Sequence, residues 1–66
     1  MTITLNGEKQ EFPGIATLPG LIEALGLAPQ TLLLEHNGCA LHRTEWANRP
    51  LADGDRVEIL RIAAGG

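Results

Sequence analysis

The chain opens with a strict alternation of polar and apolar residues. Residues 2–5 read Thr-Ile-Thr-Leu, the period of a half-buried strand. Asn6-Gly7 predicts a hairpin turn. A type I′ turn needs positive φ at both central residues, and asparagine and glycine are the residues that adopt it most readily. The returning residues 8–12 are mostly polar and end before Pro13-Gly14, so we expect an exposed edge strand there.

A helical period follows. Thr17 is a good N-cap, and Gly26 is well placed to end the helix. The apolar residues between them recur at i, i+3, i+4 and i+7, which predicts one buried stripe on a short helix. The stripe consists of Leu18, Leu21, Ile22 and Leu25.

Three more strands are predicted in the second half, over residues 31–36, 39–41 and 56–62. Asn37-Gly38 joins the first two as a second hairpin. The apolar residues of the intervening segment 42–50 follow neither the period of a strand nor that of a helix. We expect a 3₁₀ or irregular turn there, with Trp46 as its apolar anchor.

The order of these elements predicts an α+β fold of the β-grasp type. It comprises a mixed five-stranded sheet with one crossing helix, in which the first and last strands are parallel neighbours at the centre. We expect the folded domain to span residues 1–62. Residues 63–66 should form a flexible C-terminal Gly-Gly tail, because glycine is the residue least able to hold a structure.

Composition narrows the class of protein. The chain has 66 residues, 44% of them hydrophobic, and a single cysteine, so it can build a small core without a disulfide framework. Its net charge of −3 argues against nucleic acid as a partner. No signal peptide or membrane-spanning run is visible, and we expect a cytoplasmic protein without membrane contact.

No catalytic or metal-binding constellation is apparent, so we do not expect an enzyme. His36 and His42 lack an accompanying carboxylate cluster and are predicted to be surface or turn residues. Cys39 is predicted to be a small apolar strand residue, because no activating cation or helix N-terminus is near it in the sequence. Asp53-Gly54-Asp55 has the composition of a turn rather than a calcium loop.

The last strand is apolar on both faces. Val57 and Ile59 are expected to face the helix, which leaves Glu58, Leu60 and Ile62 on the opposite face. Exposed aliphatic side chains are common in folded proteins, so this face can be ordinary surface. The alternative is a partner-docking patch beside the tail, formed by these three residues.

The whole chain resembles the ThiS family of sulfur carriers in thiamine (thiazole) biosynthesis. The shared features are the opening strand with its Asn-Gly turn, the "LIEALGL" helix, the second "NG" hairpin, Arg43 and Trp46 in "R-x-x-W", "L-x-DGD-x-VEI" and the terminal Gly-Gly. The departures are small: Ala63-Ala64 where many members carry a bulkier residue or a third glycine, and Cys39 at a variable hairpin position.

The resemblance implies a function for the tail. In this family an E1-like, ThiF-like adenylyltransferase uses MgATP to activate the terminal carboxylate, here that of Gly66. Sulfur from a donor enzyme such as a cysteine desulfurase converts it to a thiocarboxylate, which a ThiG-like thiazole synthase consumes. Gly65 and Ala64 would form the slender arm that enters these enzymes, and no cofactor would be bound by the chain itself.

Two alternatives remain. The small subunit of molybdopterin synthase is another thiocarboxylate donor with this fold, although "RTEWA" and the short length favour thiazole synthesis. A ubiquitin-like protein modifier or a plain interaction module would carry the same Gly-Gly end for a different purpose.

Overall fold

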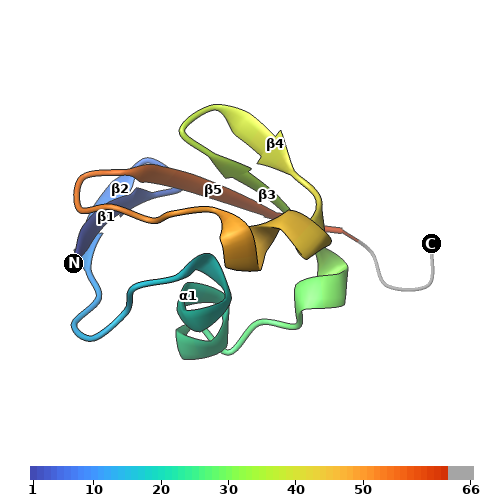
Figure 1. The fold of residues 1–66 in the computed structure, drawn as a ribbon, viewed down its shortest axis with the longest axis horizontal. Helices are drawn as coiled ribbons and strands as arrows, with labels where there is room; N and C mark the ends of the chain where they lie inside the picture. The colour runs from blue at the N-terminus through green and yellow to red at the C-terminus, as the bar shows by residue number, and fades with distance from the viewer. Residues whose placement is uncertain (63–66) are drawn as a thin grey trace.

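A computed structural model describes residues 1–62, which form a five-stranded sheet with one α-helix on one face (Figure 1). The strands are β1 (Thr2–Leu5), β2 (Glu8–Glu11), β3 (Leu32–His36), β4 (Cys39–Leu41) and β5 (Arg56–Arg61). The helices are α1 (Leu18–Ala24) and the 3₁₀ segments η1 (Pro29–Thr31) and η2 (Arg43–Asn48). The predicted tail, residues 63–66, lies outside the described residues, so the domain boundary at residue 62 stays a prediction.

The sheet has the predicted mixed topology, with strand order β2-β1-β5-β3-β4. β5 is the central strand, parallel to β1 on one side and antiparallel to β3 on the other. The two hairpins therefore meet through the last strand, and α1 lies across one face, as Figure 1 shows. This arrangement confirms the β-grasp prediction.

Both hairpins turn where the sequence places them. Asn6 and Gly7 have φ of 49° and 83°, and Asn37 and Gly38 have φ of 50° and 81°. These paired positive values identify the two-residue turns expected from Asn-Gly. Asparagine tolerates the left-handed region better than other residues with a Cβ atom, which is why the pair suits these turns.

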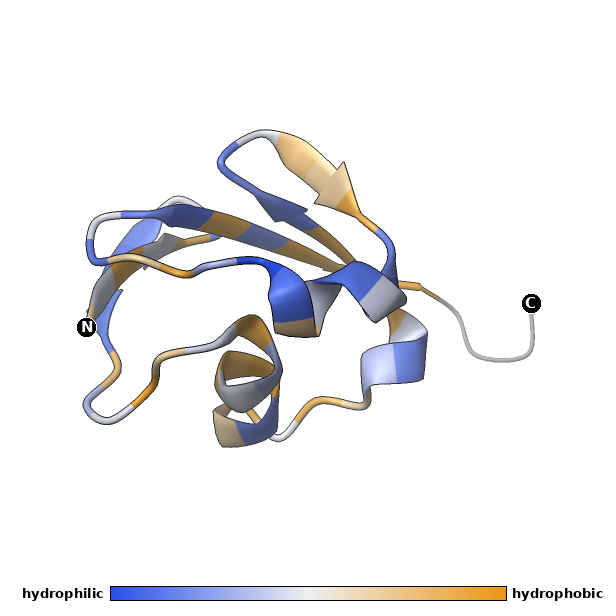
Figure 2. Ribbon diagram, viewed as in Figure 1, coloured by the Kyte–Doolittle hydropathy of each residue, from blue (hydrophilic) through white to orange (hydrophobic). Residues whose placement is uncertain are grey.

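Helix α1 begins and ends through local chemistry. The Thr17 hydroxyl accepts a hydrogen bond from the Gly20 N–H at 3.0 Å, and Gly26 has φ of 70° just beyond the helix. Its three buried side chains are Leu18, Leu21 and Ile22. Figure 2 shows this apolar side of α1 turned toward the sheet, so the predicted stripe is the surface that packs.

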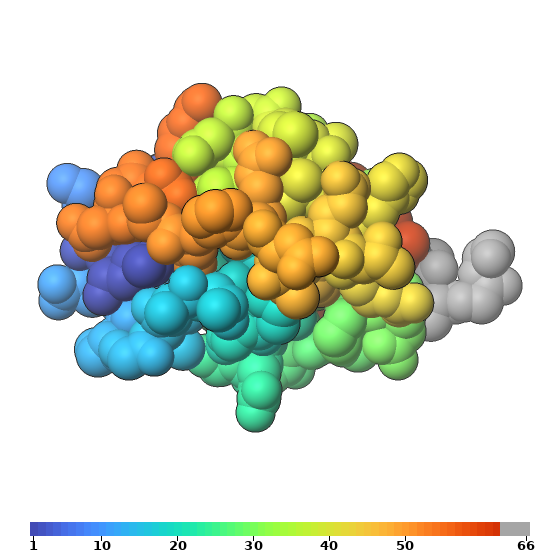
Figure 3. Space-filling model, viewed as in Figure 1, coloured from blue at the N-terminus to red at the C-terminus, as the bar shows by residue number. Residues whose placement is uncertain are grey.

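The core lies between α1 and the sheet and extends under η2. Trp46, at 3% exposure, anchors η2 to this core. In Figure 3 the side chains of this region, yellow to orange, meet those of α1, in cyan, over the same side of the molecule. The predicted 3₁₀ turn and its tryptophan anchor are both confirmed.

Candidate functional site

The face of the sheet opposite α1 presents an apolar pair close to the end of β5. We call the face of the sheet opposite α1 the outer face and define it by the side chains of Leu33, Glu35, Glu58 and Leu60. Leu60 and Ile62, the residue after β5, are 63% and 40% exposed. Leu33 on β3 is 54% exposed and lies directly opposite Leu60 in the sheet register. Two neighbouring leucines therefore stand in solvent beside the start of the tail.

Leu33 was not among the docking residues expected from the sequence, which were Glu58, Leu60 and Ile62. Alternation along β3 buries Leu32 and Leu34 and turns Leu33 outward. The alternation was the available signal, but only the register with β5 reveals that Leu33 faces Leu60. The candidate docking residues therefore span two strands instead of one.

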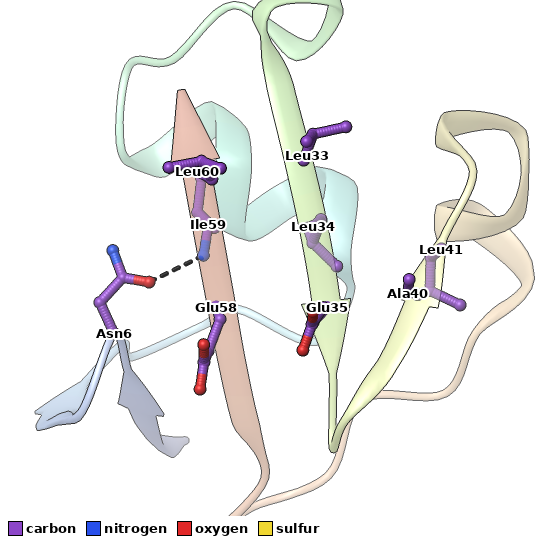
Figure 4. Close-up of a pocket in the computed structure, with 9 residues that line it drawn as sticks. All are labelled: Asn6, Leu33, Leu34, Glu35, Ala40, Leu41, Glu58, Ile59 and Leu60. Atoms are coloured by element: carbon purple, nitrogen blue, oxygen red, sulfur yellow. Dashed lines mark hydrogen bonds between the residues drawn. The ribbon is translucent and has the colours of Figure 1, made fainter. Parts of the chain in front are cut away.

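A shallow hollow of about 390 Å³ lies along the outer face (Figure 4). Its lining comes from β3, β4, β5 and the turn of the first hairpin. In Figure 4 Leu33 and Leu60 lie at one end of the labelled group, and Glu35 and Glu58 lie side by side further along the strands.

The two carboxylates of the hollow face one another across the sheet. Glu35 and Glu58 are register partners, and both are exposed. Like charges directly opposite on neighbouring strands are destabilising, by a few tenths of a kcal/mol up to about 1 kcal/mol. The outer face therefore presents exposed leucines and a pair of like-charged carboxylates close together.

The two hairpin asparagines also hold the central strand. The side-chain Oδ1 of Asn6 accepts the Ile59 N–H at 2.7 Å (Figure 4), and that of Asn37 accepts the Arg56 N–H at 2.8 Å. Each turn residue thus satisfies a backbone donor of β5 that no neighbouring strand reaches. These bonds fix the strand that leads to the tail.

The prediction for His36 was wrong, because this side chain is 4% exposed at the end of β3. Its Nδ1 accepts the Arg49 Nε–H at 2.9 Å, so the ring proton resides on Nε2, which donates to Asp55 Oδ2 at 2.7 Å. Both ring nitrogens are satisfied, as burial of a polar group requires. The cluster ties the loop after η2 and the turn before β5 to β3.

Asp55 is the acidic end of this cluster. Partial burial raises its pKa, but the hydrogen bond from the Ala52 N–H and those from His36 and Asn37 outweigh burial, and the pKa lies below its ordinary value. The Ala52 N–H to Oδ2 distance is 2.8 Å. A carboxylate that accepts several hydrogen bonds is held in its charged form.

This lowered pKa predicts a loss of stability in acid. The Asp55 carboxylate binds a proton less readily in the folded state than in the unfolded state. Its contribution to the free energy of unfolding is therefore fully present above the unfolded pKa of about 3.9 and is lost as the pH falls through the folded-state pKa. We expect the melting temperature to fall as the pH drops from about 5 through the unfolded pKa of about 3.9 and below it. In Asp55→Asn this acid-dependent part should shrink, whereas Glu23→Gln, an exposed change on α1, should leave it intact. Equal pH profiles for wild type and Asp55→Asn would contradict the assignment.

The remaining candidate residues, Cys39 and His42, are not part of the hydrogen-bonded cluster around His36. Cys39 is exposed on β4, and His42 precedes η2, where its backbone N–H donates to Glu45 at 2.7 Å. Within residues 1–62 no group of three or more histidine, cysteine or acidic side chains could hold a metal ion. No helix in that range is long and apolar enough to cross a membrane. Ala64, Gly65 and Gly66 lie outside the described residues.

Comparison with known proteins gives consistent matches over the whole chain. The model of the ThiS family matches residues 3–66. The sulfur carrier protein ThiS of Thermus thermophilus is 34% identical over 64 residues, which are 97% of this chain and 98% of that protein. The crystal structure of a thiamine biosynthesis protein (ThiS) from Geobacter metallireducens superposes with a TM-score of 0.84 at 32% identity, covering 100% of both chains.

A further match is to a much longer protein. A thiazole synthase of Magnetococcus marinus is 33% identical over 66 residues, which are 100% of this chain but 20% of that protein. The chain thus spans about a fifth of the length of this relative. A domain of the same kind forms part of that thiazole synthase polypeptide.

Proposed function

Because the chain belongs to the ThiS family, we propose that it is a sulfur carrier of thiamine biosynthesis whose carrier group is the α-carboxylate of Gly66. The observation that carries this proposal is the match over essentially the full length of both this chain and a ThiS sulfur carrier. A match confined to the sheet and helix would support only the fold, since one fold serves many functions.

The chemistry of a carboxylate explains why activation is needed. An α-carboxyl group has a pKa of about 3.5, so at neutral pH it is an ionised and unreactive acyl group. In the proposed reaction an E1-like adenylyltransferase uses MgATP to join this carboxylate to AMP, with release of pyrophosphate. A sulfur nucleophile, supplied by an enzyme such as a cysteine desulfurase, then displaces AMP. The chain acts as a carrier and co-substrate, and the enzymes supply the catalysis.

Thiazole synthase is the proposed consumer of the thiocarboxylate. In the Magnetococcus marinus relative, a domain similar to this chain is part of a thiazole synthase. Joining two components in one polypeptide raises their effective concentration, which helps components that act on one another. A separate carrier would need a docking surface instead.

Mass spectrometry tests the proposal. The chain is incubated with the adenylyltransferase, MgATP and a sulfur source, and the C-terminal peptide is analysed. A mass gain matching replacement of one oxygen by sulfur on Gly66 is expected. Attachment of the chain to lysines of other proteins would instead support a protein modifier, and an unchanged mass would contradict the carrier role.

The docking role of Glu58, Leu60 and Ile62 is part of the proposal. We expect Leu60→Glu to weaken binding to thiazole synthase or to the adenylyltransferase at least tenfold, the loss of about 1.4 kcal/mol typical of a central interface residue. Because Leu60 is 63% exposed, the melting temperature should change little. Ala24→Glu, an exposed change on α1, is the control and should preserve both affinities. Unaltered binding of Leu60→Glu to both enzymes would remove this surface from the docking site.

A further inference from the structure

Along β5 the backbone N–H and C=O groups of successive residues point alternately toward β3 and toward β1. The Arg56 carbonyl accepts from the Asn37 N–H at 2.8 Å, and the Ile62 N–H donates to the Thr31 carbonyl at 2.7 Å. Both bonds lie on the β3 side. In an antiparallel pair such residues alternate with ones whose backbone groups point the other way. The N–H and C=O groups of Val57, Ile59 and Arg61 therefore point toward β1.

On that side the ladder ends before the strand does. The Val57 carbonyl accepts from the Asn6 N–H at 2.9 Å, and the Ile59 N–H donates to the Asn6 side chain at 2.7 Å. β1 ends at Leu5, and the hairpin then turns back. The pairing of β1 with β5 ends at Leu5 and Val57, and within residues 1–62 no other segment pairs there with the Ile59 carbonyl or with the N–H and carbonyl of Arg61, which is an exposed residue. The central strand thus has an open edge over its last residues.

Hollows flank this open edge on both faces of the sheet. The hollow of the outer face and a second hollow of about 290 Å³ on the α1 side are both bordered by Asn6 and Ile59. The lining of the second is apolar except for Asn6 and Arg61, and includes Leu25 and Leu27. Successive side chains of a strand point to opposite faces. A strand added beside Ile59 would therefore direct its side chains alternately toward the two hollows.

We propose that an extended segment of thiazole synthase pairs with β5 at Ile59–Arg61 and continues the sheet where β1 leaves it. The inference rests on the proposed function for its choice of partner, and the Magnetococcus marinus relative supports that choice. Main-chain hydrogen bonds to an exposed edge provide affinity, and apolar side chains at alternate positions of the segment fit the two hollows.

The position of this edge suits delivery of the tail. Gly66 follows Arg61 by five positions, so even a fully extended chain carries it at most about 18 Å from the paired residue. Pairing at Arg61 would fix the direction of the tail as well as its distance. An orientational constraint of this kind places a reacting group more effectively than tethering alone.

Proline at position 61 tests the proposal directly. Arg61→Pro removes the N–H that points toward the open edge, and proline is tolerated in a strand where its missing N–H faces outward. We expect the dissociation constant for purified thiazole synthase, measured by calorimetry, to rise at least tenfold. Arg61→Ala keeps the N–H and removes only the side chain, which borders the second hollow, so its dissociation constant should rise clearly less than that of Arg61→Pro.

Amide hydrogen exchange of the wild-type chain gives an independent readout. The Arg61 amide should exchange quickly in the free chain and slowly when thiazole synthase is saturating. This measurement decides the question if Arg61→Pro does not fold. Unchanged exchange at Arg61, or wild-type affinity of Arg61→Pro, would overturn the strand pairing while leaving the carrier function intact. Absence of sulfur on Gly66 in the mass measurement would instead overturn the carrier function itself.

Discussion

A chain that lacks Gly66 will accept no sulfur, yet it will unfold at nearly the wild-type temperature. Within residues 1–62 every buried core residue lies between Ile3 and Val57, and the last residue of a chain generally adds little to the free energy of unfolding. The carboxylate of the shortened chain would belong to Gly65 and would stop one residue short of the adenylating site. Misplacing a reacting group by a few ångströms is enough to abolish a reaction that depends on orientation.

The deletion is compared with two substitutions that preserve length. Ala64→Ser keeps the terminal Gly-Gly and should form the thiocarboxylate at the wild-type rate. Gly65→Val adds a β-branched side chain and should slow adenylation strongly, because a narrow channel that admits glycine excludes that bulk.

Thiocarboxylate formation is followed by mass spectrometry and stability by thermal melting. A melting shift above about 4 °C, which corresponds to about 1 kcal/mol in a domain of this size, would show that Gly66 also supports the fold. Sulfur on the shortened chain would contradict the assignment of the carrier group.

Local patterns predicted nearly all of the fold because each element carries its own signal. The two Asn-Gly turns fix both hairpins, and the cap at Thr17 with the apolar stripe after it fixes α1. Strand β3 begins one residue later than predicted, at Leu32, because Thr31 closes η1, with its N–H bonded to the Ala28 carbonyl. Such differences are small because turns, caps and periodicity act over a few neighbouring residues.

Side-chain contacts between distant segments were not predictable in the same way. Alternation places His36 on the buried face with Leu32 and Leu34, so its burial was accessible from the pattern. Its partners were not, since Arg49 and Asp55 come from two later segments that only the folded chain brings together. The bond from Ile59 to the Asn6 side chain likewise depends on the register of β5 with β1.

The residues of the candidate site likewise divide into those predictable from local patterns and those that depend on contacts between distant segments. The outward position of Leu60 follows from alternation in β5, whereas its pairing with Leu33 needs the β3–β5 register. The proposed carrier role of Gly66 follows from neither, because a terminal glycine has no packing or charge pattern that specifies chemistry. That proposal rests on the membership of the chain in the ThiS family.

The second large effect is expected at Trp46, whose replacement by alanine will largely unfold the domain. Truncating a buried aromatic side chain lowers the free energy of unfolding by about 3–5 kcal/mol. A domain of this size is stable by roughly 0.05–0.15 kcal/mol per residue, so the loss is comparable to its whole stability. Trp46 is also the only buried residue of η2, and without it that segment loses its attachment to the core.

Trp46→Phe is the matched control and should remain folded. The indole Nε1 of Trp46 is buried and has no hydrogen-bond partner in the part of the chain that the structure describes. Phenylalanine removes this unsatisfied donor, whose burial costs about 1–3 kcal/mol, and the gain offsets part of the cavity left by the smaller ring. Urea unfolding gives the free energy of unfolding of each variant. The comparison separates the cost of the cavity from the gain on removing the unsatisfied donor. If Trp46→Phe lost as much stability as Trp46→Ala, the Nε1 group would have a stabilising contact, and an unaltered Trp46→Ala would show that η2 is held by its other residues.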